Sequence, residues 1–107
     1  MGHLTPAELA AWLADPARPD PLLLDVREAW EFQTCRIEGA RHIPMNEIAR
    51  RLEELDPAAG VVAICHHGVR SLHVAHFLVR QGFERVYNLS GGVNAWARAV
   101  EPTMPVY

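Results

Sequence analysis

Residues 60–82 read GVVAICHHGVRSLHVAHFLVRQG, and this stretch decides the fold. Its first part is apolar up to Cys65, as in a strand that is buried on both faces of a sheet. A helical pattern follows from residue 70 to 81 and stops at Gly82, a residue favoured just beyond helix C-termini. The segment between them is short and contains Gly68, which reaches backbone conformations that other residues avoid. The stretch therefore predicts a strand, a tight turn and a helix, the unit that builds parallel sheets.

The rest of the chain repeats this alternation of apolar strands and amphipathic helices. Strands are expected at 22–26, 41–44 and 85–89, in addition to 60–65. Helices are expected at 6–15, 28–33, 46–55 and from 91 onward, in addition to 70–81. Thr5, Pro6 and Glu8 form a helix start with a capping box. The pattern predicts an α/β fold with a parallel sheet covered by helices on both faces.

Length and composition indicate one globular domain. The chain has 107 residues, half of them apolar and about a fifth charged. We expect a single domain over 1–107, with its core at about 5–98 and an extended C-terminal tail at 99–107. Trp12, Trp30 and Trp96 are expected in this core or at its edge.

The net charge of -3 makes strong binding to nucleic acid or to an anionic membrane unexpected. No apolar run is long enough to span a membrane, and the N-terminal segment lacks the features of a signal peptide. A cytoplasmic location is therefore expected. In that reducing compartment, Cys35 and Cys65 are expected to be free thiols rather than a disulfide.

The turn after Cys65 suggests nucleophilic chemistry. Ligands bind beyond the carboxyl ends of parallel strands, which places Asp25–Arg27 and Cys65–Arg70 at the functional edge. Successive backbone N–H groups in a glycine-containing turn, joined to a helix N-terminus, form a cradle for an anion. With the fixed charge of Arg70, this cradle favours the thiolate form of the cysteine. Such a thiolate can attack an anionic substrate, and the same cradle can stabilise the covalent intermediate.

Several motifs together resemble the rhodanese family. CHHGVRS at 65–71, followed by AHFLVRQGFERVYNLSGGVNAW at 75–96, is similar to the active-site half of that domain. LLLDVREAWEFQTCRIEGARHIP at 22–44 resembles its upstream segment. The resemblance covers the chain from about Thr5 to Trp96. It implies a three-layer α/β/α domain with a five-stranded parallel sheet and no cofactor.

The implied activity is that of a sulfurtransferase of the thiosulfate:cyanide type. Cys65 takes a sulfane sulfur from thiosulfate, a persulfide or a polysulfide, holds it as a persulfide, and passes it to cyanide, a small thiol or a protein acceptor. Carried over residue by residue, the resemblance implies catalytic roles for Cys65 and Arg70, a substrate-binding loop of His66, His67, Gly68, Val69 and Ser71, and supporting roles for Asp25 and Arg27. Arg27 is expected to pair with Glu31, four residues further on.

Two departures from the family pattern bear on the donor. Cys35 and Arg36 stand where many members have a small residue and a histidine. The loop is also less basic than in members that use thiosulfate, because His66 and His67 are mostly neutral at pH 7. Thiosulfate, a dianion, is therefore expected to be a poorer donor than a persulfide or polysulfide.

The same residues allow other interpretations. A metal site from Cys65 and the histidines at 66, 67, 73 and 76 lacks the paired spacing of known zinc sites. His73 and His76 are expected on a solvated helix face, and Cys35 as a packed thiol. A cysteine phosphatase or arsenate reductase places one more residue between its cysteine and arginine than the four found here. A non-enzymatic persulfide carrier or interaction module remains the alternative of another class.

Overall fold

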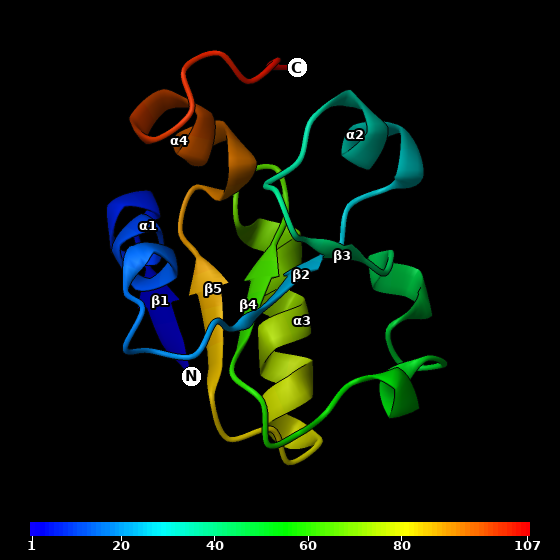
Figure 1. Cartoon of the computed structure of the whole chain (residues 1–107). Helices are drawn as coiled ribbons and strands as arrows, with labels where there is room; N and C mark the ends of the chain where they lie inside the picture. Colours follow the sequence, from blue (N-terminus) through cyan, green and yellow to red (C-terminus); the bar gives the residue numbers. More distant parts are fainter.

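The computed structural model describes residues 1–107 as a five-stranded, all-parallel sheet with helices on both faces (Figure 1). The strand order is β1-β5-β4-β2-β3. The strands are β1 Gly2–Leu4, β2 Leu22–Asp25, β3 Arg41–His42, β4 Val61–Ile64 and β5 Val86–Leu89. The helices are α1 Pro6–Ala14, α2 Ala29–Thr34, α3 Val69–Arg80 and α4 Gly92–Ala99. The predicted fold class is confirmed.

Apolar side chains form a separate core on each face of the sheet. On one face, α3 packs Val74, Ala75 and Leu78 against the strands. On the other face, α1 and α4 pack together, with Trp12 and Trp96 among their buried side chains. The central strand β4 is buried along its whole length, since its successive side chains enter the two cores in turn.

Register places the functional segments at one edge. Asp25, the last residue of β2, is the partner of Ile64, the last residue of β4. Because the strands are parallel, the segments that follow both residues leave the sheet on the same side. Figure 1 shows α2 and α4 at the end of the sheet to which the arrows of β2, β4 and β5 point. Cys65 and the segment after Asp25 therefore lie at this carboxyl edge.

The helix starts and stops follow local chemistry. Thr5 and Glu8 form the predicted capping box: the Thr5 hydroxyl accepts the Glu8 N–H at 3.1 Å, and the Glu8 carboxylate accepts the Thr5 N–H at 2.8 Å. Gly82 follows α3 with a φ of +94°, a conformation that favours glycine.

Three expectations about the elements were wrong, and one strand was missed. The first strand, Gly2–Leu4, was missed; it pairs with β5 at the edge of the sheet. Residues 46–55 form two 3-10 turns, Met45–Glu47 and Leu52–Glu54, instead of one helix. The tail is not extended throughout, because Ala99 still belongs to α4 and the chain then turns at 102–104 and buries Met104. Trp30 is 54% exposed, whereas the other two tryptophans are buried as expected.

Candidate active site

Cys65 lies directly after β4 and is almost completely buried, with 1% of its surface exposed. The turn that follows curls back over its side chain, so that the Gly68 N–H donates a hydrogen bond to Cys65 Sγ at 3.1 Å. Ser71 Oγ, from the first turn of α3, lies 3.3 Å from the same sulfur. The thiol is thus held by one backbone and one side-chain group of its own loop.

Gly68 and Asn88 fix the shape of this loop. Gly68 has a φ of +96°, and its carbonyl accepts a hydrogen bond from Asn88 Nδ2 at 3.0 Å. The other end of the Asn88 amide, Oδ1, accepts the Ser71 hydroxyl at 2.5 Å. A serine has one hydroxyl hydrogen, which can serve either this amide oxygen or an ionised Cys65 sulfur. Asn88 was not singled out from the sequence, because a polar residue in a short apolar strand carries no motif by itself.

The start of α4 closes the loop from behind. The N–H groups of Val93 and Asn94 donate to the carbonyls of Cys65 and His66 at 2.9 and 3.1 Å. Gly92 lets the helix approach this closely, since a Cβ at this position would overlap both carbonyl oxygens. Gly92 also has a φ of +60°, which again favours glycine. The expected tight turn of Ser90–Gly92 therefore has a specific role: it fixes the main chain of the loop that carries Cys65.

The N–H groups of the loop remain free. While Gly68 donates to the sulfur, the amides of His66, His67, Val69 and Arg70 donate to no other group of the protein. Those of Val69 and Arg70 open α3, where the partial positive charge of the helix is concentrated. Unpaired amides beside a buried thiol and at a helix start are the groups from which an anion cradle can be built, and the cradle itself stays a prediction.

Arg70 is not an unpaired cation. Its Nη1 and Nη2 donate to Glu31 Oε1 and Oε2 at 2.6 and 2.8 Å, a two-point ion pair from α3 to α2. The Glu31 side chain is 4% exposed and that of Arg70 is 33% exposed. The hydrogen bonds from Arg70 lower the pKa of Glu31 to about 2, against the opposing effect of burial, and the pair raises the pKa of Arg70. Glu31 was recognised only as an expected partner of Arg27.

Asp25 and Arg27 form a buried ion pair directly after β2. Arg27 is fully buried and pairs with the Asp25 carboxylate, to which its Nη2 donates at 2.7 Å. The expected pairing of Arg27 with the Glu31 carboxylate was wrong, because that carboxylate binds Arg70; Arg27 reaches only the Glu31 main-chain carbonyl, at 3.2 Å. Arg27 Nη2 also donates to the Cys35 carbonyl at 2.7 Å. Arg27 thereby ties the segment after β2 to carbonyls in the middle of α2 and at its C-terminal end.

The two loop histidines form the mouth of the site. The ring of His66 stacks on that of His67, with centroids 4.1 Å apart, and on that of Tyr107, with centroids 4.0 Å apart. Burial, together with the positive charges of Arg27 and Arg70, lowers the pKa of His66 below its usual value and so favours the neutral ring at pH 7. Val69, which was assigned to the substrate-binding loop, is the first residue of α3 and is 64% exposed.

Cys35 is a free, buried thiol, as expected, in the core shared with α1 and α4. Arg27 Nη1 lies 3.8 Å from its sulfur, a neighbour that the sequence did not reveal. No group of three or more His, Cys, Asp or Glu side chains is placed to hold a metal ion. None of the helices has the length and apolar character needed to span a membrane.

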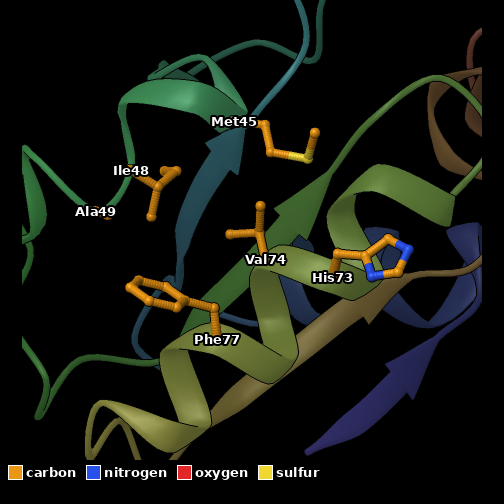
Figure 2. Close-up of a pocket in the computed structure, with 6 residues that line it drawn as sticks. All are labelled: Met45, Ile48, Ala49, His73, Val74 and Phe77. Carbon is orange, nitrogen blue, oxygen red and sulfur yellow. The ribbon is translucent and has the colours of Figure 1, made fainter.

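An apolar groove of about 190 Å³ lies beside the site rather than at it. Met45, Ile48 and Ala49 line one side of the groove, and side chains of α3 line the other (Figure 2). His73 stands at this groove and is exposed, as predicted for the solvated face of α3. Cys65 is not among the lining residues, so the groove does not contain the candidate nucleophile.

The family profile of the Rhodanese-like domain matches residues 5–99. The chain belongs to the rhodanese-like family. A thiosulfate sulfurtransferase GlpE of Glaesserella parasuis is 40% identical over 83 residues, which cover 78% of this chain and 77% of that protein. A thiosulfate sulfurtransferase GlpE of Vibrio cholerae is 32% identical over 102 residues, which cover 95% of this chain and 96% of that protein. The crystal structure of a protein of Staphylococcus saprophyticus has the same fold, with a TM-score of 0.84 at 29% identity over 94% of this chain and 97% of that one.

Proposed function

We propose that this rhodanese-like protein is a sulfurtransferase that carries a sulfane sulfur as a persulfide on Cys65. The single observation that supports this most strongly is the environment of Cys65 Sγ, which accepts the Gly68 N–H within a loop whose other amides are free. Fixed N–H groups stabilise a sulfur anion without having to reorganise during the reaction. Both named relatives are thiosulfate sulfurtransferases, which supports the same reaction class.

The proposed reaction has two steps that balance in atoms and charge. In the first, the Cys65 thiolate attacks the outer sulfur of the donor; a new S–S bond forms, and the donor's own S–S bond breaks. With thiosulfate, sulfite leaves with the electron pair of that bond. In the second step, cyanide or a thiolate attacks the outer sulfur of the Cys65 persulfide. The product is thiocyanate or a new persulfide, and the Cys65 thiolate is restored.

The loop residues take distinct parts in this cycle. The free amides of His66 and His67 and those that open α3 are available to the outer sulfur, which is the charged atom of the persulfide. The Ser71 hydroxyl turns its hydrogen from Asn88 to the Cys65 sulfur when that sulfur is ionised. Because Cys65 is 1% exposed, only a small end of a donor or acceptor reaches it.

We propose a persulfide or polysulfide as the preferred donor over thiosulfate. The mouth of the site has no unpaired fixed cation: Arg70 is neutralised by Glu31, Arg27 is neutralised by Asp25, and His66 is neutral. A dianion that enters such a mouth gives up water without gaining a full opposite charge. Comparing kcat/KM for thiosulfate with that for glutathione persulfide tests this preference, and a clear preference for thiosulfate would refute it.

Mass spectrometry of the intact protein tests the central proposal. After incubation with thiosulfate or glutathione persulfide, we expect a mass gain of one sulfur at Cys65 that cyanide removes. Cys65→Ser should abolish the adduct, whereas the matched control Cys35→Ser should keep it. Absence of an adduct with both donors would refute the sulfurtransferase proposal and favour a non-enzymatic module. The proposed place of the reaction is the cytoplasm, where both cysteines stay reduced.

A further inference from the structure

Tyr107 lies against the catalytic loop although it follows Cys65 by more than forty positions in the sequence. Its ring stacks on His66 at 4.0 Å between centroids, with an interplanar angle of 22°. The edge of the exposed Trp30 ring packs against it at 5.3 Å. The gap enclosed by Cys35, His66 and the chain around Tyr107 is too narrow to hold a water molecule. The tail is thus seated on the site and not merely near it.

The hydroxyl of Tyr107 occupies a defined position between two charged groups. Arg27 Nη1 donates to it at 2.8 Å, and it donates to Glu31 Oε2 at 2.9 Å. Burial raises the pKa of Tyr107 to about 12, so the hydroxyl keeps its proton and can make both contacts at once. Hydrogen bonds to charged partners are the stronger kind in proteins.

These contacts reach both ends of the segment that carries the chemistry. His66 follows Cys65 directly, and its ring stacks on the Tyr107 ring. Arg70 closes the loop at its other end, and it is held by the same Glu31 carboxylate that accepts the Tyr107 hydroxyl. Tyr107, which lies outside the loop, therefore contacts His66 directly and is linked to Arg70 through the Glu31 carboxylate.

We propose that Tyr107 is a positioning residue for sulfur uptake: it holds His66 and the Glu31–Arg70 pair in place, so that the loop keeps its free amides around Cys65. This inference rests on the proposed function, since the rate it affects is that of persulfide formation on Cys65. The tail that we expected to be extended is, on this view, part of the site.

The hydroxyl and the ring can be tested separately. Tyr107→Phe keeps the stack on His66 and removes only the two hydrogen bonds, whereas Tyr107→Ala removes both contacts. Tyr87→Phe is the matched control, because Tyr87 packs on Trp12 in the pocket formed at the other end of the strands. Thr103→Ala is the control within the tail, since Thr103 is exposed, its side chain makes no hydrogen bond and it does not border the gap beside His66.

Two quantities are measured for each variant. The first is the rate of Cys65 persulfide formation from glutathione persulfide, followed by quenched mass spectrometry. We expect a decrease of about threefold for Tyr107→Phe, because Arg27 and Glu31 keep their other charged partners after both bonds of the hydroxyl are removed. For Tyr107→Ala we expect about tenfold, which corresponds to about 1.4 kcal/mol at 25 °C. Both controls should react at the rate of the unchanged protein.

The second quantity is the NMR signal of the His66 imidazole, assigned with His66→Gln. It should stay in place in Tyr107→Phe and move in Tyr107→Ala, because a stacked aromatic ring shifts the resonances of its neighbour. A purely structural role would lower Tm but leave the rate at 25 °C unchanged. Wild-type uptake rates in both variants, or an unchanged His66 signal in Tyr107→Ala, would overturn the proposal. If Tyr107→Ala does not fold, a wild-type rate in Tyr107→Phe would overturn the role of the hydroxyl.

The test separates this proposal from the proposed function. If the unchanged protein takes up no sulfur from either donor, the sulfurtransferase proposal fails. In that case the His66 signal alone decides whether Tyr107 positions the loop: movement in Tyr107→Ala supports it, and no movement refutes it.

Discussion

Replacing Glu31 with glutamine should destabilise the protein in a pH-dependent way. Glu31 accepts both ends of the Arg70 guanidinium, the Tyr107 hydroxyl and the main-chain N–H of Glu28, while its side chain is 4% exposed. Glutamine has the same shape and can still accept hydrogen bonds, but it carries no charge. The substitution therefore leaves a partly buried Arg70 without its counter-ion.

The magnitude follows from the pKa of Glu31. A carboxyl group whose pKa is 4.5 in the unfolded chain and about 2 in the folded protein contributes about 3 kcal/mol to the free energy of unfolding at pH 7. A lowered pKa means that this contribution is complete above pH 4.5 and is lost as the pH falls toward 2. At pH 3.5 about 2 kcal/mol remains. Because the amide keeps part of the hydrogen bonding, we expect Glu31→Gln to cost about 2–3 kcal/mol at pH 7, or roughly 10–20 °C in Tm.

Urea denaturation followed by circular dichroism measures the free energy of unfolding of the unchanged protein and of Glu31→Gln at pH 7 and at pH 3.5. The difference between the two proteins should shrink by about 1 kcal/mol at the lower pH. Glu53→Gln is the control, because Glu53 is exposed and forms no ion pair, so its effect should be small at both pH values. A loss under about 0.5 kcal/mol at pH 7 would show that the pair contributes nothing. An equal loss at both pH values would show that its contribution is not ionic.

Three further outcomes concern the loop. Gly92→Ala should lower the free energy of unfolding by roughly 2 kcal/mol or more in urea denaturation, because its Cβ overlaps the carbonyls of Cys65 and His66; an unchanged midpoint would contradict the close approach of α4. Ser71→Ala should slow persulfide formation and cost about 1–3 kcal/mol, since it leaves the Asn88 oxygen buried without a donor; wild-type kinetics would remove Ser71 from the mechanism. Glu31→Gln should raise kcat/KM for thiosulfate, relative to that for glutathione persulfide, by about tenfold. This is the scale of one charge-assisted hydrogen bond, which the Arg70 guanidinium can give to thiosulfate once Glu31 no longer neutralises it. An unchanged ratio would show that the Glu31–Arg70 pair does not determine the donor.

The strand, turn and helix of residues 60–82 could be predicted because their signals are local. An apolar run, a glycine and a helical period each act over a few residues, and the structure has β4, a glycine turn and α3 there. The same logic failed at 46–55, where Ile48, Leu52 and Leu55 have helical spacing. Two 3-10 turns bury Ile48 and Leu55 equally well, and the backbone departs from the helix at Arg51, with ψ at +18°. Periodicity reports which side chains are buried, not which backbone buries them.

Contacts between distant segments were beyond the sequence. Strand β1 has only three residues and exists through its pairing with β5, more than eighty positions away. The Glu31 carboxylate lies 39 positions from Arg70 and 76 from Tyr107. Arg27 stands four positions before Glu31, at the spacing of a local pair, and that proximity in sequence suggested the wrong partner. Residue types and spacing singled out Cys65, Arg70, Asp25 and Arg27 as candidates. They did not indicate Asn88 or Tyr107, and the fold decides how all of these side chains pair.

Under the proposed function, the pairing explains how a small domain protects a reactive sulfur. Every fixed charge around the loop is matched, with Asp25 on Arg27 and Glu31 on Arg70, so the stabilisation available to a sulfur anion comes from amide dipoles. Hydrogen bonds to the loop carbonyls fix the orientation of those dipoles. The first turn of α4 binds the carbonyls of Cys65 and His66, and Asn88 binds that of Gly68. With the carbonyls engaged behind the loop, the N–H groups are left for the sulfur. A site built in this way needs no ordering when substrate arrives, and the burial of Cys65 keeps all but small reactants away.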